Sequence, residues 1–306
     1  MTECGLRGIR YRLGEPREID ELPELVADPG LLEVFKLRGL ARYAAAATGP
    51  TEAGRAVLGD SLAAAAIDPG SVDVVVYGTD LVADALFTQE GMNDLLLTCG
   101  LDRAYPLGVS LSGCNGVASV LDIASSLVRA GTARRVACLV IGQLAHGVSR
   151  LMDLSMSVLS DAAVACVVTD EPGELRLLRV GRANLPEIGR LSIVTQTQAY
   201  FAATARTLQI AVDEALAPLA MTRSDLSRVL TNNYARHIQQ AFLRHAGFRA
   251  DQSWLGNLSR FAHAFSADTL INLADCIAAG ELAPAQRCLL LGTSPSSCGA
   301  VVVEMN

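Results

Sequence analysis

The sequence predicts an α/β fold made of two successive halves with the same order of elements. Strand-like apolar runs alternate with helical segments, which is typical of a largely parallel sheet covered by helices. The order of the first half recurs in the second, which indicates a duplicated unit. With 306 residues, 51% of them hydrophobic and 19% charged, the chain can bury a large core.

The first half contains four predicted strands and one buried helix. The runs VDVVVYGTD (72–80), RRVACLVIG (134–142) and AAVACVVTD (162–170) are short and apolar, as buried strands are. A fourth strand, LGVSLSG (107–113), leads into a helix over 115–130. The small residues and the two-sided apolar pattern of this helix predict burial on most of its faces.

The second half repeats this order. A capped helical turn over 224–234 leads into a strand that ends near Asn232. The other predicted elements are helices over 200–220, 235–247 and 266–282 and two strands, 286–292 and 299–305, that form a hairpin around TSPSS. The best boundary is EPGEL (171–175), which divides the chain into halves 1–172 and 173–306. No Pro-rich or Ser-rich linker separates the halves, so we expect them to pack as one body.

The composition argues against several classes of function. A net charge of −7 and a pI near 5.2 disfavour nucleic acid as a partner, because nucleic-acid binding needs a basic face. The N-terminus is polar and no apolar run reaches the roughly 18–20 residues of a membrane span, so we expect a cytoplasmic protein with no membrane contact. The cysteines form no CxxC pair, and no metal site is expected. Cys138, Cys166 and Cys288 lie in strand-like runs and are expected to be buried free thiols.

Cys114 is the cysteine in a glycine-flanked setting, within GVSLSGCNGVASVLDIA (108–124). It lies between a predicted strand and a predicted helix. A helix N-terminus offers unpaired N–H groups and a positive dipole end, which stabilise the reactive thiolate. The N–H of Cys114 is then a candidate oxyanion donor. From these residues alone, two interpretations stay open: a nucleophile at a strand-to-helix turn, or a thiol chosen for its size.

A nucleophilic cysteine needs a base, and the chain has four histidines. His237 and His245 share one polar helix and are expected to face solvent, whereas His146 follows a strand end and suits either a cleft or the surface. His263 stands before a predicted helix, and Asp268 follows near its first turn. Asp268 suits either a helix N-terminal charge or the carboxylate that orients the imidazole of a triad.

These motifs, in this order, resemble the ketoacyl synthase III branch of the thiolase superfamily. SLSGCNGVAS, with Cys114, is similar to that family's nucleophile elbow. Its GDGAGA, PHQAN and GNTSAAS segments and its closing hairpin resemble, respectively, LSDAAVACVV (159–168), VLTNNYARHI (229–238), AHAFSADTLINLADCIAAGEL (262–282) and LLLGTSPSSCGAVVVE (289–304). The resemblance runs from about residue 30 to the end. It implies a thiolase fold with a duplicated αβαβα five-layer core, the nucleophile in the first half and the catalytic His in the second.

The active-site positions depart from the usual family set. In decarboxylating members, a His from HQAN and an Asn from GN flank the Cys. Here the first position is Asn232 and the second is His263. This arrangement resembles a divergent subgroup of natural-product pathways that primes polyketide synthases or transfers acyl groups to hydroxyls. The resemblance implies that Cys114 is acylated, that His263 activates the attacking group, that Asp268 orients His263, and that Asn232 is a substrate-binding residue.

Two further segments differ from the family. The family's glycine-rich closing loop supplies a backbone N–H to the oxyanion hole, but here Pro295 stands in that loop and has no N–H to donate. The resemblance leaves Ser294 or Ser296 as the donor, and we take Ser296 as substrate-binding. The tryptophan of the family's coenzyme A-gripping segment is absent from EVFKLRGLAR (33–42). This absence favours an acyl carrier protein, with its own phosphopantetheine arm, over coenzyme A as the thioester donor.

Three functions remain open at this point. The first is an acyltransferase that carries an acyl group on Cys114 and passes it to a hydroxyl, an amine or a second carrier. The second is a decarboxylating condensing enzyme with shifted catalytic residues. The third is an inactive partner subunit. Claisen condensation needs two donors near the thioester carbonyl, whereas acyl transfer to oxygen needs one base and an oxyanion hole, which suits one His paired with one carboxylate better.

The resemblance also implies partners. We expect no tightly bound cofactor, and a phosphopantetheine thioester as donor. Lys36, Arg38 and Arg42 either meet the acidic surface of a carrier protein or form a solvated charge run. The acceptor is expected to be a small molecule. The fold implies a homodimer in which the edge strand near the nucleophile pairs across a two-fold axis, with 83–108 near the interface and Phe87 beside the partner's pocket.

Overall fold

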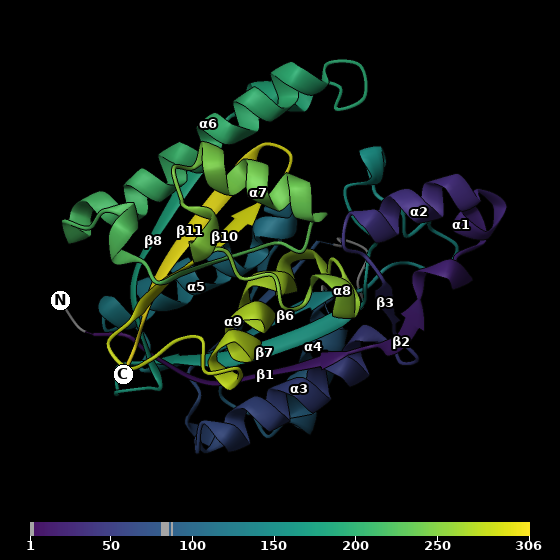
Figure 1. Ribbon diagram of the computed structural model, residues 1–306. Coiled ribbons are helices and arrows are strands. Elements are labelled where there is room, and N and C mark those ends of the chain that lie inside the picture. The colour runs from purple at the N-terminus through teal and green to yellow at the C-terminus, as the bar shows by residue number, and fades with distance from the viewer. Residues whose placement is uncertain (1–2, 81–85, 87) are drawn as a thin grey trace.

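The computed structural model in Figure 1 describes residues 3–80, 86 and 88–306. Its main sheet joins strands in the order β5-β4-β6-β7-β1-β8-β11-β10-β9. The strands are β1 (Gly5–Leu13), β4 (Val74–Thr79), β5 (Tyr105–Val109), β6 (Arg135–Gly142), β7 (Ala162–Thr169), β8 (Leu175–Asn184), β9 (Arg228–Thr231), β10 (Arg287–Thr293) and β11 (Ser297–Met305). The first five in that order come from the first half and the last four from the second. The chain passes between the halves in the residues that separate β7 from β8, which include the first four residues of EPGEL.

Helices cover both outer faces and fill the space between the two halves of the sheet, which gives five layers (Figure 1). The two central helices are α5 (Gly116–Arg129) and α9 (Asp268–Ala278). The outer helices are α3 (Pro50–Ala64) and α4 (Gln89–Thr98) on the first half, and α6 (Thr197–Leu216) and α7 (Arg236–His245) on the second. A small layer beside them holds β2 (Glu15–Glu18), β3 (Arg42–Ala45), α1 (Pro23–Ala27), α2 (Pro29–Leu37) and α8 (Leu258–Phe261).

The central layer carries the core that positions the site. One apolar cluster joins α5, α9 and strands of both halves, and it includes Val117, Leu121, Ile271, Val140 and Leu290. Residues of α5 are buried on both of its sides, as its small-residue pattern predicts. α5 follows Cys114 and α9 begins at Asp268, and the 3₁₀ turns that precede these two helices contact each other, which brings residues of the two halves together at the site.

The prediction of a largely parallel sheet is wrong. Only the pairs β4–β5, β4–β6 and β9–β10 are parallel among the described strands. The pairs β6–β7, β7–β1, β1–β8, β8–β11 and β10–β11 are antiparallel. β1 and β8 have no counterpart among the predicted elements, because charged residues interrupt their apolar runs, as Arg10 and Arg12 do in β1. These two strands pair with each other in antiparallel orientation and so join the strands of the first half to those of the second.

Most of the other predicted elements are confirmed, with shifted ends. The hairpin 286–305 is antiparallel, and Cys138, Cys166 and Cys288 are buried free thiols. The helix predicted over 266–282 begins at Asp268, after a 3₁₀ turn at Phe265–Ala267. In the described part of the chain, no helix is long and apolar enough to cross a membrane.

Gly181 provides a test of how closely the outer helix packs on the sheet. A Cβ added to Gly181 would lie 2.2 Å from the carbonyl oxygen of Ala211 and 2.5 Å from the amide nitrogen of Ala215, both on α6. Backbone atoms of a helix cannot move aside locally, so we expect Gly181→Ala to lower the free energy of unfolding by about 1–3 kcal/mol. Urea denaturation measures this, with Gly189→Ala as the matched control because nothing lies within 4 Å of its added Cβ. Equal stability of the two variants would contradict this packing.

Candidate active site

Cys114 lies in a short 3₁₀ turn, Gly113–Asn115, immediately before α5. The turn follows β5 and Leu111, which has a φ of 68°. Gly113 has a φ of 49°, and a Cβ added there would lie 2.9 Å from the Cβ of Ser294. Glycine is therefore required both by the left-handed backbone and by the close approach of the β10–β11 turn. The Cys114 side chain is partly accessible.

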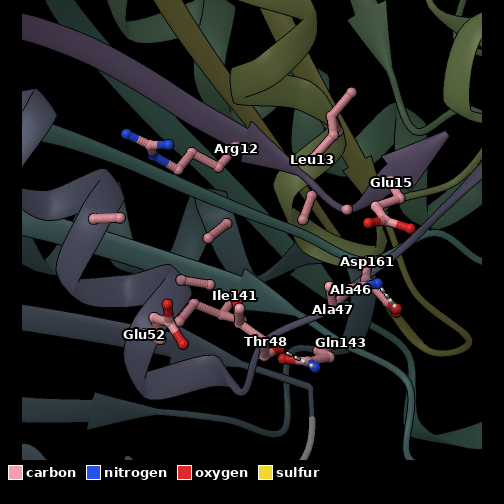
Figure 2. A pocket seen from close by; sticks show the side chains of 15 residues that line it. Arg12, Leu13, Glu15, Ala46, Ala47, Thr48, Glu52, Ile141, Gln143 and Asp161 are labelled. Atoms are coloured by element: carbon pink, nitrogen blue, oxygen red, sulfur yellow. Dashed lines mark hydrogen bonds between the residues drawn. The ribbon is translucent and has the colours of Figure 1, made fainter.

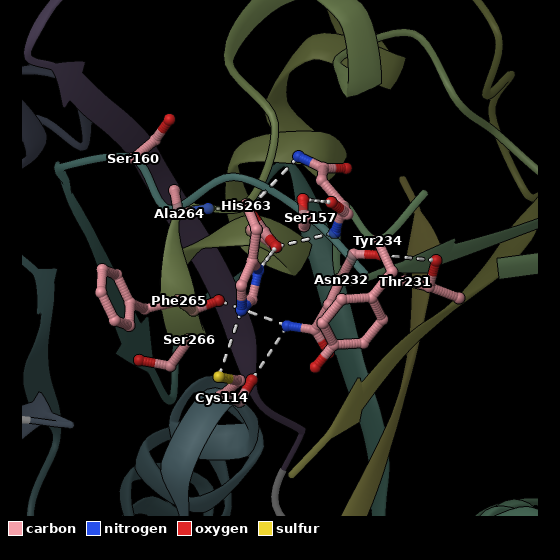
Figure 3. A network of polar contacts seen from close by, with 12 residues as sticks. Cys114, Ser157, Ser160, Thr231, Asn232, Tyr234, His263, Ala264, Phe265 and Ser266 are labelled. Atoms are coloured by element: carbon pink, nitrogen blue, oxygen red, sulfur yellow. Dashed lines mark hydrogen bonds and ion pairs between the residues drawn. The ribbon is translucent and has the colours of Figure 1, made fainter. Parts of the chain in front are cut away.

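His263 lies between Cys114 and Asp268. Figure 3 shows its ring directed at the sulfur of Cys114. Its Nε2 is 3.2 Å from the Sγ of Cys114, and its Nδ1 is 2.5 Å from Oδ2 of Asp268. The side chains of His263 and Asp268 are both 0% exposed. The first half of the chain thus supplies the sulfur, and the second supplies the imidazole and the carboxylate. This is the geometry of a nucleophile, a base and an orienting acid.

The Asp268 carboxylate accepts three hydrogen bonds besides that of His263. The backbone N–H of Asn233 donates to Oδ2 over 2.7 Å, and its side-chain amide donates to Oδ1 over 3.2 Å. The backbone N–H of Ala264 also donates to Oδ1, over 2.7 Å. A buried carboxylate needs such donors to offset the loss of water. They hold Asp268 in one orientation at the start of α9.

A cavity of about 500 Å³ opens beside Cys114. Its lining is mainly apolar and aromatic. It comes from the loop before β7, the segment before α6, the helices α6 and α7, and the turns that hold Cys114, Tyr234, Phe265 and Ser294. The lining residues include Leu151, Met152, Met156, Leu191, Ile193, Tyr200, Tyr234, Phe242, Phe265 and Ser294. No Lys or Arg lines it among the described residues, and Asp153 is its one carboxylate there. The cavity therefore suits an uncharged, largely apolar group next to the sulfur.

Comparison with solved structures identifies the fold that carries these residues. The acyltransferase ChlB3 superposes with a TM-score of 0.82 at 22% identity over 99% of this chain and 98% of that one. The 3-oxoacyl-[acyl-carrier-protein] synthase III of Aquifex aeolicus VF5 has a TM-score of 0.82 at 16% identity over 98% and 99%. The priming β-ketosynthase of the R1128 polyketide pathway has a TM-score of 0.79 at 19% identity over 98% and 96%.

The C-terminal family model of 3-oxoacyl-[acyl-carrier-protein] synthase III matches residues 216–305, which carry His263 and Asp268. The chain has the ketoacyl synthase III-like thiolase fold. The fold and the resemblance predicted from the sequence are therefore confirmed. Comparison with curated proteins finds no match by sequence.

Asn232 lies beside Cys114, His263 and Asp268 but does not line the cavity. It is 0% exposed. Its amide donates to the carbonyls of Cys114, over 3.0 Å, and Phe265, over 3.3 Å (Figure 3). Its Oδ1 accepts from the N–H of Thr293 over 2.8 Å. These bonds connect the nucleophile turn, the His263 loop and the end of β10. Its amide is engaged by the protein itself, so the structure does not place Asn232 as a substrate contact.

The closing loop also differs from expectation. Ser294 and Pro295 line the Cys114 cavity, whereas Ser296 lines a separate cavity with Ser112, Ser119 and Arg182. The structure therefore does not bring Ser296 to the triad. The N–H of Ser294 donates to the carbonyl of Ser297 over 2.8 Å, within the β10–β11 turn. In this geometry neither Ser294 nor Pro295 offers a free N–H to an oxyanion, and the N–H of Cys114 remains the donor predicted for it.

Asn233, Tyr234 and Asp80 also lie at this site, although the sequence did not single them out. Asn233 and Tyr234 follow Asn232 in TNNYA, and the ring of Tyr234 packs against the imidazole of His263 with centroids 4.9 Å apart. Side chains that follow a strand end alternate in direction, and this alternation could have predicted that Asn233 points to the core and Tyr234 to the cavity. Asp80 accepts from the N–H of Ser266 over 3.3 Å. Burial raises the pKa of Asp80 to about 6, although the nearby charge of His263 lowers it.

The remaining candidates lie away from the triad. His245 bonds the Ala241 carbonyl on its own helix, and His237 lines a shallow hollow with Arg38. Burial, and then the charge of Arg38, lowers the pKa of His237. A second cavity of about 270 Å³ beside β1 is lined by Arg12, Glu15 and Asp161, among others (Figure 2). Asp161 is paired with Arg150, and Arg12 is paired with Asp60.

The charge state of His263 has a consequence for stability. Burial alone would lower its pKa, but the Asp268 carboxylate and then the Cys114 sulfur raise it to about 10. In the unfolded chain the pKa returns to about 6.5. Pairing with the imidazolium therefore stabilises the fold fully below about pH 6.5, and this stabilisation is lost as the pH rises through about 10.

We expect the free energy of unfolding of the wild type to fall between pH 7 and pH 10 more steeply than that of His263→Gln, which cannot bind this proton. Urea denaturation at intervals across this range measures both slopes. The variant is its own control for the titration of surface groups. Parallel curves would show that His263 is not protonated in the folded protein at neutral pH.

Proposed function

We propose that the protein is an acyltransferase of the divergent ketoacyl synthase III-like type, in polyketide or related natural-product biosynthesis. It takes an acyl group from a carrier-protein or coenzyme A thioester onto Cys114 and passes it to a hydroxyl, an amine or a second carrier. The observation that carries the proposal is the continuous Cys114–His263–Asp268 arrangement, with separations of 3.2 Å and 2.5 Å.

In the first half-reaction the thiolate of Cys114 attacks the carbonyl carbon of the donor thioester. A C–S bond to Cys114 forms, and the negative charge moves to the carbonyl oxygen, beside the N–H of Cys114 at the start of α5. The bond to the donor sulfur then breaks. The leaving thiolate takes the proton that His263 holds on Nε2, which leaves a neutral imidazole.

In the second half-reaction the neutral His263 accepts the proton of the acceptor hydroxyl as its oxygen attacks the acyl-Cys114 carbonyl. The C–O bond forms, the C–S bond breaks, and Cys114 returns to a thiolate beside an imidazolium. Oδ2 of Asp268 accepts from Nδ1 of the ring and fixes it as a donor, which leaves Nε2 free for the proton. A thioester intermediate preserves the reactivity of the incoming thioester for this step.

Two observations support transfer over decarboxylating condensation. A malonyl donor carries a carboxylate, but the described lining of the cavity contains no Lys or Arg to receive it. The amide of Asn232, which stands at the position of the HQAN histidine of decarboxylating members, is engaged by the carbonyls of Cys114 and Phe265. One base and no second free donor suit transfer to a heteroatom better than stabilisation of a carbanion.

We propose that an acyl carrier protein carries the donor thioester and that the active form of the protein is a homodimer. Of the basic residues predicted to meet the carrier, Lys36 and Arg42 pair with Glu33 and Glu18, and remain about half exposed at 44% and 55%. Arg38 donates to the carbonyls of Leu154 and Ser155 beside the cavity.

β5 ends the strand order, so its outer edge faces no other described strand. We propose this edge as the one that pairs with a second copy across a two-fold axis. Phe87 lies outside the described residues. A cytoplasmic location remains part of the proposal.

The test is intact-protein mass after mixing the protein with a panel of acyl carrier proteins and acyl thioesters. We expect a mass gain equal to the acyl group in the wild type and none in Cys114→Ala. Alcohol, sugar and amine acceptors are then added to find which discharge the adduct. Release of CO₂ from a malonyl donor, with formation of a C–C bond, would favour the condensing function. No adduct with any donor, in a folded protein, would favour the partner-subunit function.

A further inference from the structure

A chain of buried amides connects the catalytic carboxylate to the protein surface. It starts at Asp268, passes through Asn233, Asn272 and Asn257, and ends at Arg260. The three asparagines are 1%, 1% and 2% exposed. They come from separate places: Asn233 follows β9, Asn272 lies in α9, and Asn257 precedes α8. Buried amides are costly unless they are paired, so their alignment on one line needs an explanation.

Every link of this chain has the same sense. The guanidinium of Arg260 donates to Oδ1 of Asn257 over 3.0 Å. Nδ2 of Asn257 donates to Oδ1 of Asn272 over 3.0 Å, and Nδ2 of Asn272 donates to Oδ1 of Asn233 over 2.9 Å. Nδ2 of Asn233 then donates to Asp268 over 3.2 Å. A guanidinium can only donate and a carboxylate can only accept, so the two ends impose one direction on the three amides between them.

Side contacts prevent the amides from reversing. Nδ2 of Asn272 also donates to the Thr231 carbonyl over 2.9 Å, and Nδ2 of Asn257 also donates to Asp275 over 2.8 Å. A flipped amide would present an oxygen to an oxygen at both places. At the surface, the guanidinium of Arg260, about half exposed, also pairs with Asp275 at 2.6 Å. The chain is therefore anchored at its outer end by an ion pair.

We infer that Asn272, with Asn233 and Asn257, is a positioning residue that holds the Asp268–His263 dyad in its catalytic orientation. Aligned dipoles in a dry interior polarise one another, so the chain presents a strengthened donor to Asp268. Amides do not ionise, so the chain conducts no proton and acts through orientation and field alone. The inference rests on the proposed function only for its effect on transfer, since the dyad geometry exists without substrate.

The test uses two readouts that do not need the natural substrate. The first is the far-downfield proton resonance of the His263 Nδ1–H, identified by its loss in Asp268→Asn. The second is the rate of alkylation of the Cys114 peptide by iodoacetamide at pH 7, which reports how well His263 holds the thiolate. In Asn272→Ala we expect the resonance to move upfield and alkylation to slow by about tenfold, because a small misplacement of a catalytic group has large rate effects. Asn93→Ala, on the exposed side of α4, is the matched control.

Arg260→Met and Asn257→Ala are second tests in case Asn272→Ala does not fold, because they interrupt the row of hydrogen-bonded amides nearer the surface. Smaller shifts of the same sign in both readouts support the inference. A folded Asn257→Ala and Arg260→Met with the wild-type resonance and alkylation rate would overturn it. If the wild type is alkylated rapidly and shows the resonance but accepts no acyl group from any thioester, the proposed function fails while this inference stands.

Discussion

His263→Gln is expected to reduce acyl transfer from Cys114 by about 10²–10⁴-fold, the range that a positioned general base contributes. The imidazole Nε2 is 3.2 Å from the sulfur, and no other histidine among the described residues bonds to Cys114. Glutamine keeps a side-chain donor for the buried Asp268 but cannot accept and return the acceptor's proton. Both half-reactions lose their acid and base.

Single-turnover measurement separates these effects. Acyl-Cys114 formed by a reactive thioester is followed by mass, and its discharge to the acceptor is timed in both proteins. His245→Ala is the matched control, because the hydrogen bond of its imidazole is to the Ala241 carbonyl on its own helix, away from Cys114. A His263→Gln variant that discharges the acyl group at the wild-type rate would show that another group removes the acceptor's proton.

Asp268→Asn is expected to have an effect of comparable size, about 10³–10⁴-fold on transfer, by a different route. An amide at this position can donate to Nδ1, which would place the ring proton on Nε2, where it blocks proton transfer from the acceptor. The same change removes the acceptor of the backbone N–H of Asn233, which bonds the same oxygen, Oδ2, as the ring does. Breaking a buried pair of this kind also destabilises a protein, by about 3–5 kcal/mol.

The distinguishing measurement is the pH dependence of Cys114 alkylation. The Asp268 carboxylate raises the pKa of His263 to about 10, against the effect of burial. The wild type should therefore keep its imidazolium and its fast alkylation through neutral pH. In Asp268→Asn the imidazolium is lost at a lower pH, and alkylation at pH 7–8 should slow. Asp251→Asn is the control, because it also changes an aspartate to asparagine but removes only an exposed salt bridge with Arg249. Identical profiles for the wild type and Asp268→Asn would remove Asp268 from the mechanism.

Much of the site was predictable because its residues stand in local sequence patterns that are typical of strand ends and helix starts. Cys114 follows an apolar strand and a glycine that a left-handed turn requires, and it precedes a helix. His263 and Asp268 are five residues apart across the start of another helix, a spacing that lets one fold back on the other. Strand β10 and its hairpin partner are likewise continuous apolar runs. Covalent spacing and periodicity constrain each of these features.

Other features depend on contacts between distant segments. The direction of β1 and β8, the placement of Asn232 against three backbone groups, and the orientation of the closing turn have no local signature. Ser294 and Ser296 illustrate this, because they differ by two positions in the chain yet line different cavities. A turn residue can face either side until its packing partners are known.

The sequence by itself determined which residue types stand at the turn, at the base and at the start of α9, and in what order. The tertiary structure decided which of them meet. It brought Cys114 to His263 across the two halves, and it turned the amide of Asn232 away from the cavity toward backbone carbonyls. It also aligned Asn233, Asn272 and Asn257 behind Asp268. The physical reason is that local backbone preference acts over a few residues, whereas the orientation of a buried polar side chain is chosen by the partners that packing places around it.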